Sequence, residues 1–172
     1  MQQNGEVVVA PGARHFTKRW PPDYYAELIK LIYEKYGQKC ILVGGREDIP
    51  IAKQIISLTA DVPVHSVVGE FSILQTAALI ERAHLVICND SGLMHIAAAY
   101  QKPTIAFFGS TVQEFGFFPA NSKAIVLENQ NLSCRPCSHI GRSRCPKKHF
   151  RCLIEITPQQ VLVEIEKNRF LS

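Results

Sequence analysis

The sequence lacks the long apolar segment that a membrane-spanning helix requires, since none of its 172 residues belongs to an uninterrupted apolar run of about 18 or more. Its N-terminus, MQQNGEVVVAPG, also lacks the basic region followed by an apolar stretch that is typical of a secretory signal peptide. We therefore expect a cytoplasmic protein without a membrane span. With 47% hydrophobic residues the chain is long enough to bury one core, which predicts a single domain over residues 1–172.

Two common nucleotide-binding motifs are also missing. There is no G-x-G-x-x-G and no G-K-[ST], so the sequence supports neither a nicotinamide dinucleotide site nor a Walker-type phosphate loop. Internal repeats and low-complexity tracts are absent as well. The composition therefore favours an ordinary globular protein over a fibrous or disordered one.

Acidic residues are absent from segment 132–153, although the whole chain has 15 of them and a formal net charge of +4. The segment carries +6, which leaves −2 for the rest of the chain. Such a charge can face the phosphates of a nucleotide, an anionic glycolipid or a membrane surface, and it is equally typical of a solvated loop. No row of stacking aromatic residues is interleaved with the basic ones, so nucleic acid is not expected as a partner. The basic residues are Arg135, Arg142, Arg144, Lys147, Lys148 and Arg151.

What the sequence does contain is an alternation of short β-favouring runs with helical segments. The runs are EVVVA, CILVG, VHSVV, LVICN, TIAFF and AIVLE. Helical periodicity, in most cases with capping residues, lies between several of them and near the C-terminus, at 21–37, 72–83, 93–100 and 157–171. Strands that alternate with helices form a parallel sheet. The predicted fold is α/β, a Rossmann-like three-layer domain with a parallel sheet of about six strands.

Chemically unusual loops follow five of the predicted strands. The carboxyl ends of parallel strands meet at one edge, so PGARHFTKRWP, GGREDIP, GEFS, NDSGLMH and GSTVQEFG are expected to share one surface. Glycines allow close backbone approach, hydroxyl and N–H groups donate to phosphate, and Arg14 and Lys18 add positive charge. Together these features predict a nucleotide-diphosphate site. Each also has a structural interpretation, because glycines make tight turns, Asp90 and Ser91 can cap a helix, and His95 can belong to the core.

The six cysteines form two groups. Cys40 and Cys88 lie inside predicted strands, where they act as small buried apolar residues. The other four begin with a C-x₂-C pair and can supply thiolates for a structural zinc ion. Two disulfides, which a reducing compartment disfavours, and free thiols in an irregular loop are the alternatives that stay open. We assign no metal to the functional site, and the sequence distance from the strand-end loops predicts a structural role for Cys134, Cys137, Cys145 and Cys152.

Four stretches carry a resemblance to a known family. PGARHFTKRWPPDYYAEL, ILVGGREDIPIA, VICNDSGLMHIAAAYQKPTIAFFGST and the late cysteine pattern resemble the C-terminal half of the ADP-heptose–lipopolysaccharide heptosyltransferases of glycosyltransferase family 9. The resemblance covers nearly the whole chain. It implies one half of a GT-B fold, in which two Rossmann-like domains face each other across a cleft and the C-terminal one binds the nucleotide-sugar donor. The N-terminal acceptor domain is expected to be absent from these residues.

The resemblance also implies roles for single residues. Lys18 contacts the donor diphosphate, and Glu47 lies where the family holds the ribose. We interpret Asp90 as an acceptor of hydrogen bonds from sugar hydroxyls, because a carboxylate beside a diphosphate is repelled, and the helix start at Gly92 as facing the phosphates. The family's catalytic base belongs to the other domain, so no catalytic residue and no cofactor are expected here. The segment that contacts the phosphates and the transferred sugar is matched by Asp90, Ser91, Gly92, Leu93 and His95.

The function that this resemblance implies is that of a donor-binding domain of a glycosyltransferase. The enzyme would move heptose from ADP-heptose to the inner core of lipopolysaccharide, with peripheral contact to the inner face of the inner membrane, and this domain alone is expected to be inactive. Two alternatives remain. One is a GT-B domain that uses another nucleotide sugar, and the other is a non-catalytic nucleotide-binding or interaction module that contacts partners through the basic cysteine loop.

Overall fold

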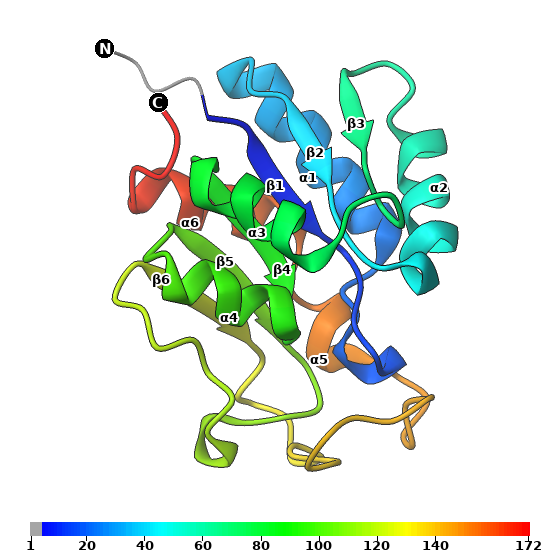
Figure 1. Cartoon of the computed structure of the whole chain (residues 1–172). Helices are drawn as coiled ribbons and strands as arrows, with labels where there is room; N and C mark the ends of the chain where they lie inside the picture. Colours follow the sequence, from blue (N-terminus) through cyan, green and yellow to red (C-terminus); the bar gives the residue numbers. More distant parts are fainter. Residues whose placement is uncertain (1–4) are drawn as a thin grey trace.

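The computed structural model describes residues 5–172, which build a six-stranded sheet whose strands all run parallel (Figure 1). The strand order is β3-β2-β1-β4-β5-β6. This arrangement confirms the predicted α/β fold. The strands are β1 (Val7–Ala10), β2 (Cys40–Leu42), β3 (Val64–Ser66), β4 (Leu85–Asn89), β5 (Thr104–Phe108) and β6 (Ala124–Glu128).

Helices cover both faces of the sheet, so the molecule has three layers. Successive side chains of a strand point to opposite faces, and Val7 and Val9 accordingly lie in one core while Val8 and Ala10 lie in the other. Full burial of such a valine contributes roughly 1.5–3 kcal/mol. The first core is covered by α1 (Pro22–Tyr36), α2 (Ile49–Leu58), α5 (Arg151–Ile154) and α6 (Pro158–Lys167). The second is covered by α3 (Ile73–Arg82) and α4 (Gly92–Ala99), which lie in front of the sheet in Figure 1.

The sequence pattern does not predict helix α2, and its N-terminus explains why. Ala52 and Ile55 are buried, and Ile49, Ile51 and Ile56 pack partly against the core. The helix starts without the side-chain cap that marks the starts of α3 and α6, so its sequence gives a weaker signal. The predicted strands at 40–44 and 64–68 are each two residues longer than β2 and β3.

The order of the strands creates a switch point between β1 and β4. Chain connections from β1 lead to β2 on one side, whereas β4 continues to β5 on the other. In open sheets of this kind the crevice outside the carboxyl ends of the two central strands is where ligands bind. Asn89, at the end of β4, ties the loop after β1 into place: its side-chain oxygen accepts from Trp20 N–H at 2.9 Å, and its amide donates to the Pro11 carbonyl at 2.8 Å.

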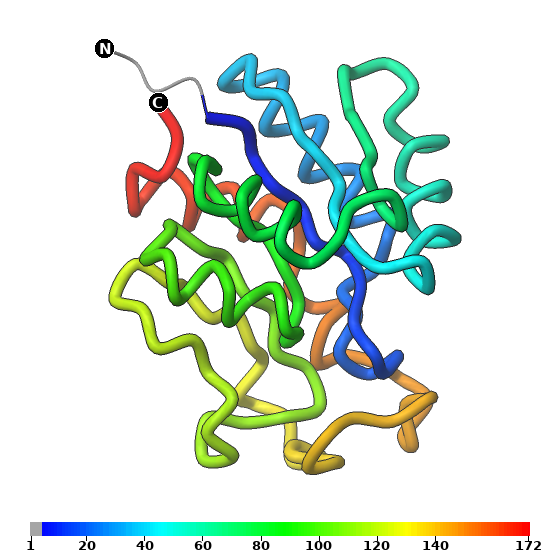
Figure 2. Tube along the Cα trace, in the orientation of Figure 1, coloured from blue at the N-terminus to red at the C-terminus, as the bar shows by residue number. Residues whose placement is uncertain are grey.

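A long irregular segment, which we call the cysteine loop (residues 129–150), runs along the same edge of the sheet. Figure 2 shows its trace, yellow to orange, passing from the end of β6 to the loop that follows β1, in blue. It includes most of the acid-free segment noted in the sequence. None of the helices within residues 5–172 combines the length and the apolar character needed to span a membrane.

Candidate functional site

A pocket of about 850 Å³ opens at the carboxyl edge of the sheet, beside the β1/β4 switch point, and we call it the switch-point pocket. Four parts of the chain line it: the loop after β1, the loop after β2 with the short 3-10 helix η2 (Arg46–Asp48), the segment leading into α3, and the start of α4. These parts come from both halves of the sheet. The topology alone therefore brings them together, as the alternation of strands and helices predicts.

Four of the seven predicted donor-binding residues line this pocket, namely Glu47, Ser91, Gly92 and Leu93. Lys18 and Asp90 lie next to its wall, because Asp90 directly precedes Ser91 and the Lys18 ammonium is 2.7 Å from the Asp90 carboxylate. His95 is exposed on α4 and does not line the pocket, so it is not the core histidine of the structural interpretation, and its role as a sugar contact stays a prediction.

Glycines on the pocket wall make room for a buried carboxylate. A Cβ atom at Gly12 would lie 2.2 Å from the Asp48 carboxyl group, and one at Gly44 would lie 2.7 Å from it. Asp48 is only 9% exposed and accepts a hydrogen bond from Gly45 N–H at 3.0 Å. Burial raises the pKa of Asp48 above its ordinary value, and the Gly45 hydrogen bond opposes this rise. The glycines of PGAR and GGRED therefore serve the packing of this wall.

The start of α4 offers unpaired hydrogen-bonding groups to the pocket. Ser91 is the N-cap residue, yet its hydroxyl makes no capping bond, and its Oγ is buried without a partner among the described residues. A buried polar atom normally finds a partner, so this hydroxyl is suited to a ligand. A Cβ at the next residue, Gly92, would meet nothing within 4 Å, so the first turn of the helix is open to an approaching anion.

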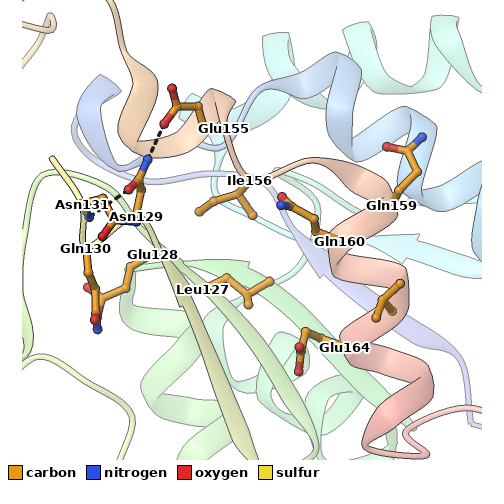
Figure 3. A pocket seen from close by; sticks show the side chains of 11 residues that line it. Leu127, Glu128, Asn129, Gln130, Asn131, Glu155, Ile156, Gln159, Gln160 and Glu164 are labelled. Carbon is orange, nitrogen blue, oxygen red and sulfur yellow. Dashed lines mark hydrogen bonds between the residues drawn. The ribbon is translucent and has the colours of Figure 1, made fainter.

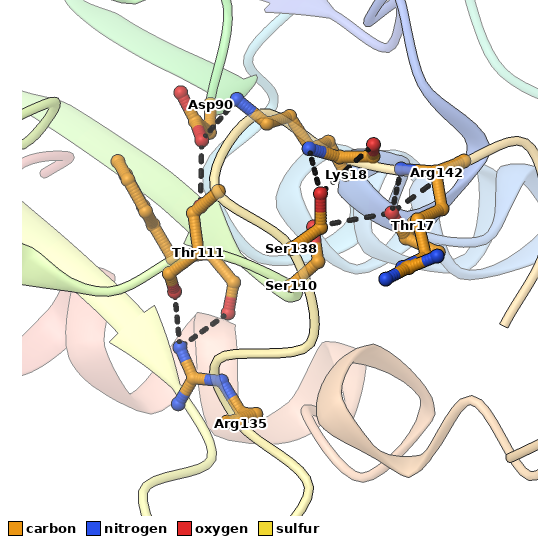
Figure 4. A network of polar contacts seen from close by, with 10 residues as sticks. Thr17, Lys18, Asp90, Ser110, Thr111, Arg135, Ser138 and Arg142 are labelled. Carbon is orange, nitrogen blue, oxygen red and sulfur yellow. Dashed lines mark hydrogen bonds and ion pairs between the residues drawn. The ribbon is translucent and has the colours of Figure 1, made fainter. Parts of the chain in front are cut away.

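A chain of polar contacts fixes Lys18 and Asp90 at the edge of the pocket (Figure 4). Lys18 is the last residue of the 3-10 turn η1 (Phe16–Lys18), which lies in the loop after β1, and Asp90 follows β4. The Thr111 hydroxyl donates to the same Asp90 oxygen that Lys18 contacts, at 2.8 Å. The side chain of Lys18 is 11% exposed and that of Asp90 is 5% exposed, so water screens this pair only weakly.

The cysteine loop packs directly against η1, which corrects the expectation that it lies apart from the strand-end loops. Thr17 and Arg142 exchange backbone and side-chain bonds: Thr17 N–H donates to the Arg142 carbonyl at 3.1 Å, and Arg142 N–H donates to Thr17 Oγ1 at 2.8 Å. A Cβ at Gly141 would lie 2.6 Å from the His15 side chain. Phe16 also stacks on Phe150, with ring centroids 4.7 Å apart. Distance in sequence was a poor guide because the loop folds back onto the edge of the sheet.

All six cysteines are free thiols. Burial raises the pKa of Cys152 to about 11, and it raises the pKa of Cys137 as well, with the neighbouring cysteine thiols adding to both shifts. Cys134 Sγ lies 3.8 Å from His149 Nε2. Within residues 5–172 no three His, Cys, Asp or Glu side chains are gathered closely enough to hold a metal ion, so the zinc interpretation gains no support from the geometry.

A second pocket, of about 780 Å³, lies between the end of β6 and helix α6, and we call it the β6–α6 pocket (Figure 3). Its lining includes three carboxylates, Glu128, Glu155 and Glu164, alongside several side-chain amides. A diphosphate carries negative charge and is repelled by such a wall. The β6–α6 pocket is therefore unsuited to the ligand class that the strand-end loops predict.

The sequence did not single out several residues that line the switch-point pocket. Asp48 follows Glu47 in GGRED and was not separated from it, although its position between the glycines makes it the more buried of the two. Phe71 comes from the loop before α3. Ile73 and Thr76 come from α3 and Ile96 comes from α4, where only the rotation of the helices decides which side chains face inward.

Comparison with known proteins gives a consistent result. Glycosyltransferase family 9 (heptosyltransferase) matches residues 2–149 of the chain. Lipooligosaccharide heptosyltransferase 2 of Campylobacter jejuni is 29% identical over 172 residues, covering 96% of this chain and 52% of that protein. Lipopolysaccharide heptosyltransferase 2 of Escherichia coli is 31% identical over 159 residues, covering 90% of this chain and 44% of that protein.

A solved structure agrees with the sequence comparison. The structure of E. coli ADP-heptose lps heptosyltransferase II superposes with a TM-score of 0.79 at 29% identity, covering 98% of this chain and 47% of that one. The chain thus spans about half the length of the curated relatives that it matches.

Proposed function

The chain belongs to glycosyltransferase family 9, the heptosyltransferases, and from this membership we propose that it is the donor-binding domain of an enzyme that transfers heptose from ADP-heptose to the inner core of lipopolysaccharide. The observation that carries the proposal is the switch-point pocket. It combines an open helix start at Gly92, an unpartnered Ser91 hydroxyl and a lysine at its edge. These groups suit the diphosphate of a nucleotide sugar.

Each part of the pocket has a task in this proposal. Glu47 accepts hydrogen bonds from the ribose hydroxyls, which a carboxylate on the pocket wall is suited to do. The first turn of α4 and Lys18 face the diphosphate. Leu93 and the remaining apolar residues of the wall contact the base, since a flat aromatic ring gains most from apolar neighbours. His95 contacts the transferred sugar only if that sugar reaches the exposed side of α4, and the buried Asp90 contacts it only if the sugar reaches the carboxylate that also holds Lys18.

The reaction proceeds by direct displacement. An acceptor hydroxyl attacks the anomeric carbon of heptose, its proton passes to an acidic residue of the N-terminal domain, and the bond between that carbon and the phosphate oxygen breaks. The electron pair leaves with ADP. Lys18 and the N–H groups at the start of α4 stabilise the negative charge that develops on the departing phosphate. The residues of this chain therefore bind the donor and stabilise the leaving group, and they supply no base.

The basic cysteine loop provides a surface for the acceptor side of the reaction. Arg142, Arg144, Lys147 and Lys148 are exposed, and the charges of such a cluster attract anionic lipid surfaces. We place this loop against phosphate groups of the lipid acceptor at the cytoplasmic face of the inner membrane. Free cysteine thiols fit the reducing cytoplasm. Sedimentation with vesicles of phosphatidylglycerol and phosphatidylcholine, compared for the parent and the Arg144→Glu/Lys147→Glu variant, tests this placement, and equal sedimentation of both proteins contradicts it.

Calorimetric titration of the 172-residue chain with ADP, UDP and GDP tests the main proposal. We expect ADP to bind most tightly and GDP and UDP to bind at least about tenfold more weakly, which corresponds to about 1.4 kcal/mol. Tighter binding of UDP or GDP would favour the alternative of another nucleotide sugar. The absence of binding by all three nucleotides would contradict the donor-binding function and favour an interaction module.

A further inference from the structure

Thr111 is linked through Asp90 to Lys18, the residue that we predict to contact phosphate. Its side chain is completely buried, and its hydroxyl donates to Asp90 Oδ2 at 2.8 Å. The same carboxylate oxygen receives the Lys18 ammonium at 2.7 Å. Thr111 therefore shares one acceptor with the lysine that we place on the donor diphosphate, without reaching the pocket itself (Figure 4).

The backbone around Thr111 is held independently of this hydroxyl. Arg135, from the cysteine loop, donates to the Thr111 carbonyl at 2.8 Å and to the Gly109 carbonyl at 2.6 Å, and it also pairs with Glu128 at 2.7 Å. These bonds fix the loop after β5 whether or not the Thr111 hydroxyl is present. The hydrogen bond from the Thr111 hydroxyl to Asp90 therefore orients the carboxylate, and it contributes less to the position of the loop.

We propose that Thr111 is a positioning residue for Lys18: its hydroxyl fixes the Asp90 carboxylate, and the carboxylate in turn holds the lysine ammonium beside the start of α4. This inference rests on the donor-binding function proposed above. A carboxylate with a single fixed donor can rotate about its terminal torsion, which is broad and roughly two-fold. The second donor removes that freedom. The Lys18 ammonium has three N–H donors, so the bond to Asp90 leaves two for phosphate.

The position of Lys18 is further restricted from the other side. Its ammonium lies over the Phe117 ring at 5.4 Å from the ring centroid, and the preceding residue, Thr17, is clamped by Arg142. Preorganised charges stabilise a developing phosphate charge better than mobile ones, because they do not need to reorganise when the ligand arrives. Removal of the Thr111 hydroxyl is expected to leave the contacts of Lys18 with Phe117 and of Thr17 with Arg142 in place.

Titration of ADP into a set of variants tests the proposal. Thr111→Val removes the hydroxyl at nearly constant volume and is expected to weaken ADP binding about fivefold, which is less than the loss of a direct hydrogen bond to a charged group because the hydroxyl acts through Asp90. Thr111→Ser keeps the hydroxyl and is expected to restore affinity to within about twofold of the parent. Thr104→Val is the matched control. Thr104 is also a buried threonine, but it is the first residue of β5, at the opposite end of that strand from Thr111, and its hydroxyl donates to the Lys102 carbonyl.

A double-mutant cycle with Lys18→Ala separates positioning from a general structural role. In the Lys18→Ala background, Thr111→Val is expected to change ADP affinity by less than about twofold, because the group that it positions is gone. The same fivefold loss in both backgrounds would overturn the proposal, as would a Thr111→Val variant that binds like the parent. If Thr111→Val melts below the assay temperature, Thr111→Ala takes its place in the cycle. A parent chain that binds no ADP overturns the donor-binding function, whereas binding by the parent together with additive losses overturns only the role of Thr111.

Discussion

The switch-point pocket and the β6–α6 pocket have similar volumes, about 850 and 780 Å³, but opposite chemistry. The first presents an open helix start, glycine backbone and a lysine at its edge. The second presents three carboxylates, each of which already has a basic partner: Arg135 for Glu128, Arg151 for Glu155 and Lys167 for Glu164. Pocket volume therefore does not distinguish a ligand site in this molecule. The charge of the lining groups and whether they are already paired distinguish the two pockets.

Topology explains the difference between the two pockets. The switch-point pocket lies where the loops after β1 and β4 diverge, so backbone N–H groups and loop side chains face an open crevice. The β6–α6 pocket lies beside the last strand of the sheet, where a helix packs back over the strand end. Its polar side chains satisfy one another, as the bond from Asn129 to Glu155 shows (Figure 3).

The largest expected effect concerns catalysis by the switch-point pocket alone. The 172-residue chain, saturated with ADP-heptose and supplied with acceptor lipid, is expected to transfer no sugar at an enzymatic rate. Removing a general base costs roughly 10²- to 10⁴-fold, and unassisted encounter with the acceptor costs more. Radiolabelled heptose transfer, measured with and without a separately expressed N-terminal half from a relative, checks this expectation. Robust turnover by the chain alone would show that catalytic residues lie within it.

The next effect compares one charged residue from each pocket. Lys18→Ala is expected to weaken ADP binding by about 1–3 kcal/mol, roughly 5- to 150-fold, because a charge-assisted bond to phosphate is lost. Glu164→Gln, in the β6–α6 pocket, is the matched control and is expected to leave affinity within about twofold. Calorimetric titration measures both. Equal affinity of the Lys18 variant and the parent would remove Lys18 from the site, and a large effect of Glu164→Gln would show that we have chosen the wrong pocket.

How far the sequence predicts these two regions depends on the kind of signal each contains. The parallel sheet follows from β-favouring runs separated by capped helices, and the pocket positions of Glu47, Ser91 and Gly92 follow from their places after strands. Phe71 belongs to the predicted strand-end loop GEFS, but Thr76 could not be predicted, because the rotation of α3 that turns it toward the pocket depends on packing. The sequence does not distinguish Asp48 from its neighbour Glu47, and the low exposure of Asp48 together with the close approach of Gly12 identifies it as the buried carboxylate.

The cysteine loop contains no periodic signal at all. Its contact with Thr17 depends on backbone bonds of Arg142 and on the small size of Gly141, which a linear pattern does not encode. The predictions for this region therefore rest on its charge, its cysteine spacing and its distance in sequence, and only the structure shows that it lies beside η1.

A smaller effect tests whether the cysteine loop supports the switch-point pocket. Cys137→Ser is expected to lower the free energy of unfolding by about 1 kcal/mol, because a half-buried thiol is replaced by a more polar hydroxyl, and to lower Tm by about 3 °C. Through the contact between Arg142 and Thr17 it is also expected to weaken ADP binding, by less than about threefold. Thermal denaturation with and without ADP measures both changes, and metal analysis of the purified protein accompanies it. Unchanged melting would show that the thiol does not support the loop, and stoichiometric zinc would favour the metal interpretation.

The smallest effect concerns the buried carboxylate behind the pocket wall. Burial raises the pKa of Asp48 from its ordinary value of 3.8, so the ionised form costs stability in the folded protein. The pKa of Asp48 is higher in the folded state than in the unfolded state. The protonated form therefore contributes its full stabilisation to the folded protein below pH 3.8, and this stabilisation is lost as the pH rises through the raised pKa. Asp48→Asn keeps the acceptor for Gly45 N–H and cannot ionise, so its stability relative to the parent is expected to increase between pH 4 and pH 7. Asp61→Asn is the control of opposite sign, because the hydrogen bond from Lys30 lowers the pKa of Asp61. This variant is expected to lose stability relative to the parent as the pH rises toward 3.8, and its relative stability is expected to change little between pH 4 and pH 7. Urea denaturation at several pH values measures both differences, and an Asp48→Asn variant whose relative stability stays constant with pH would mean that the carboxylate is solvated within the switch-point pocket.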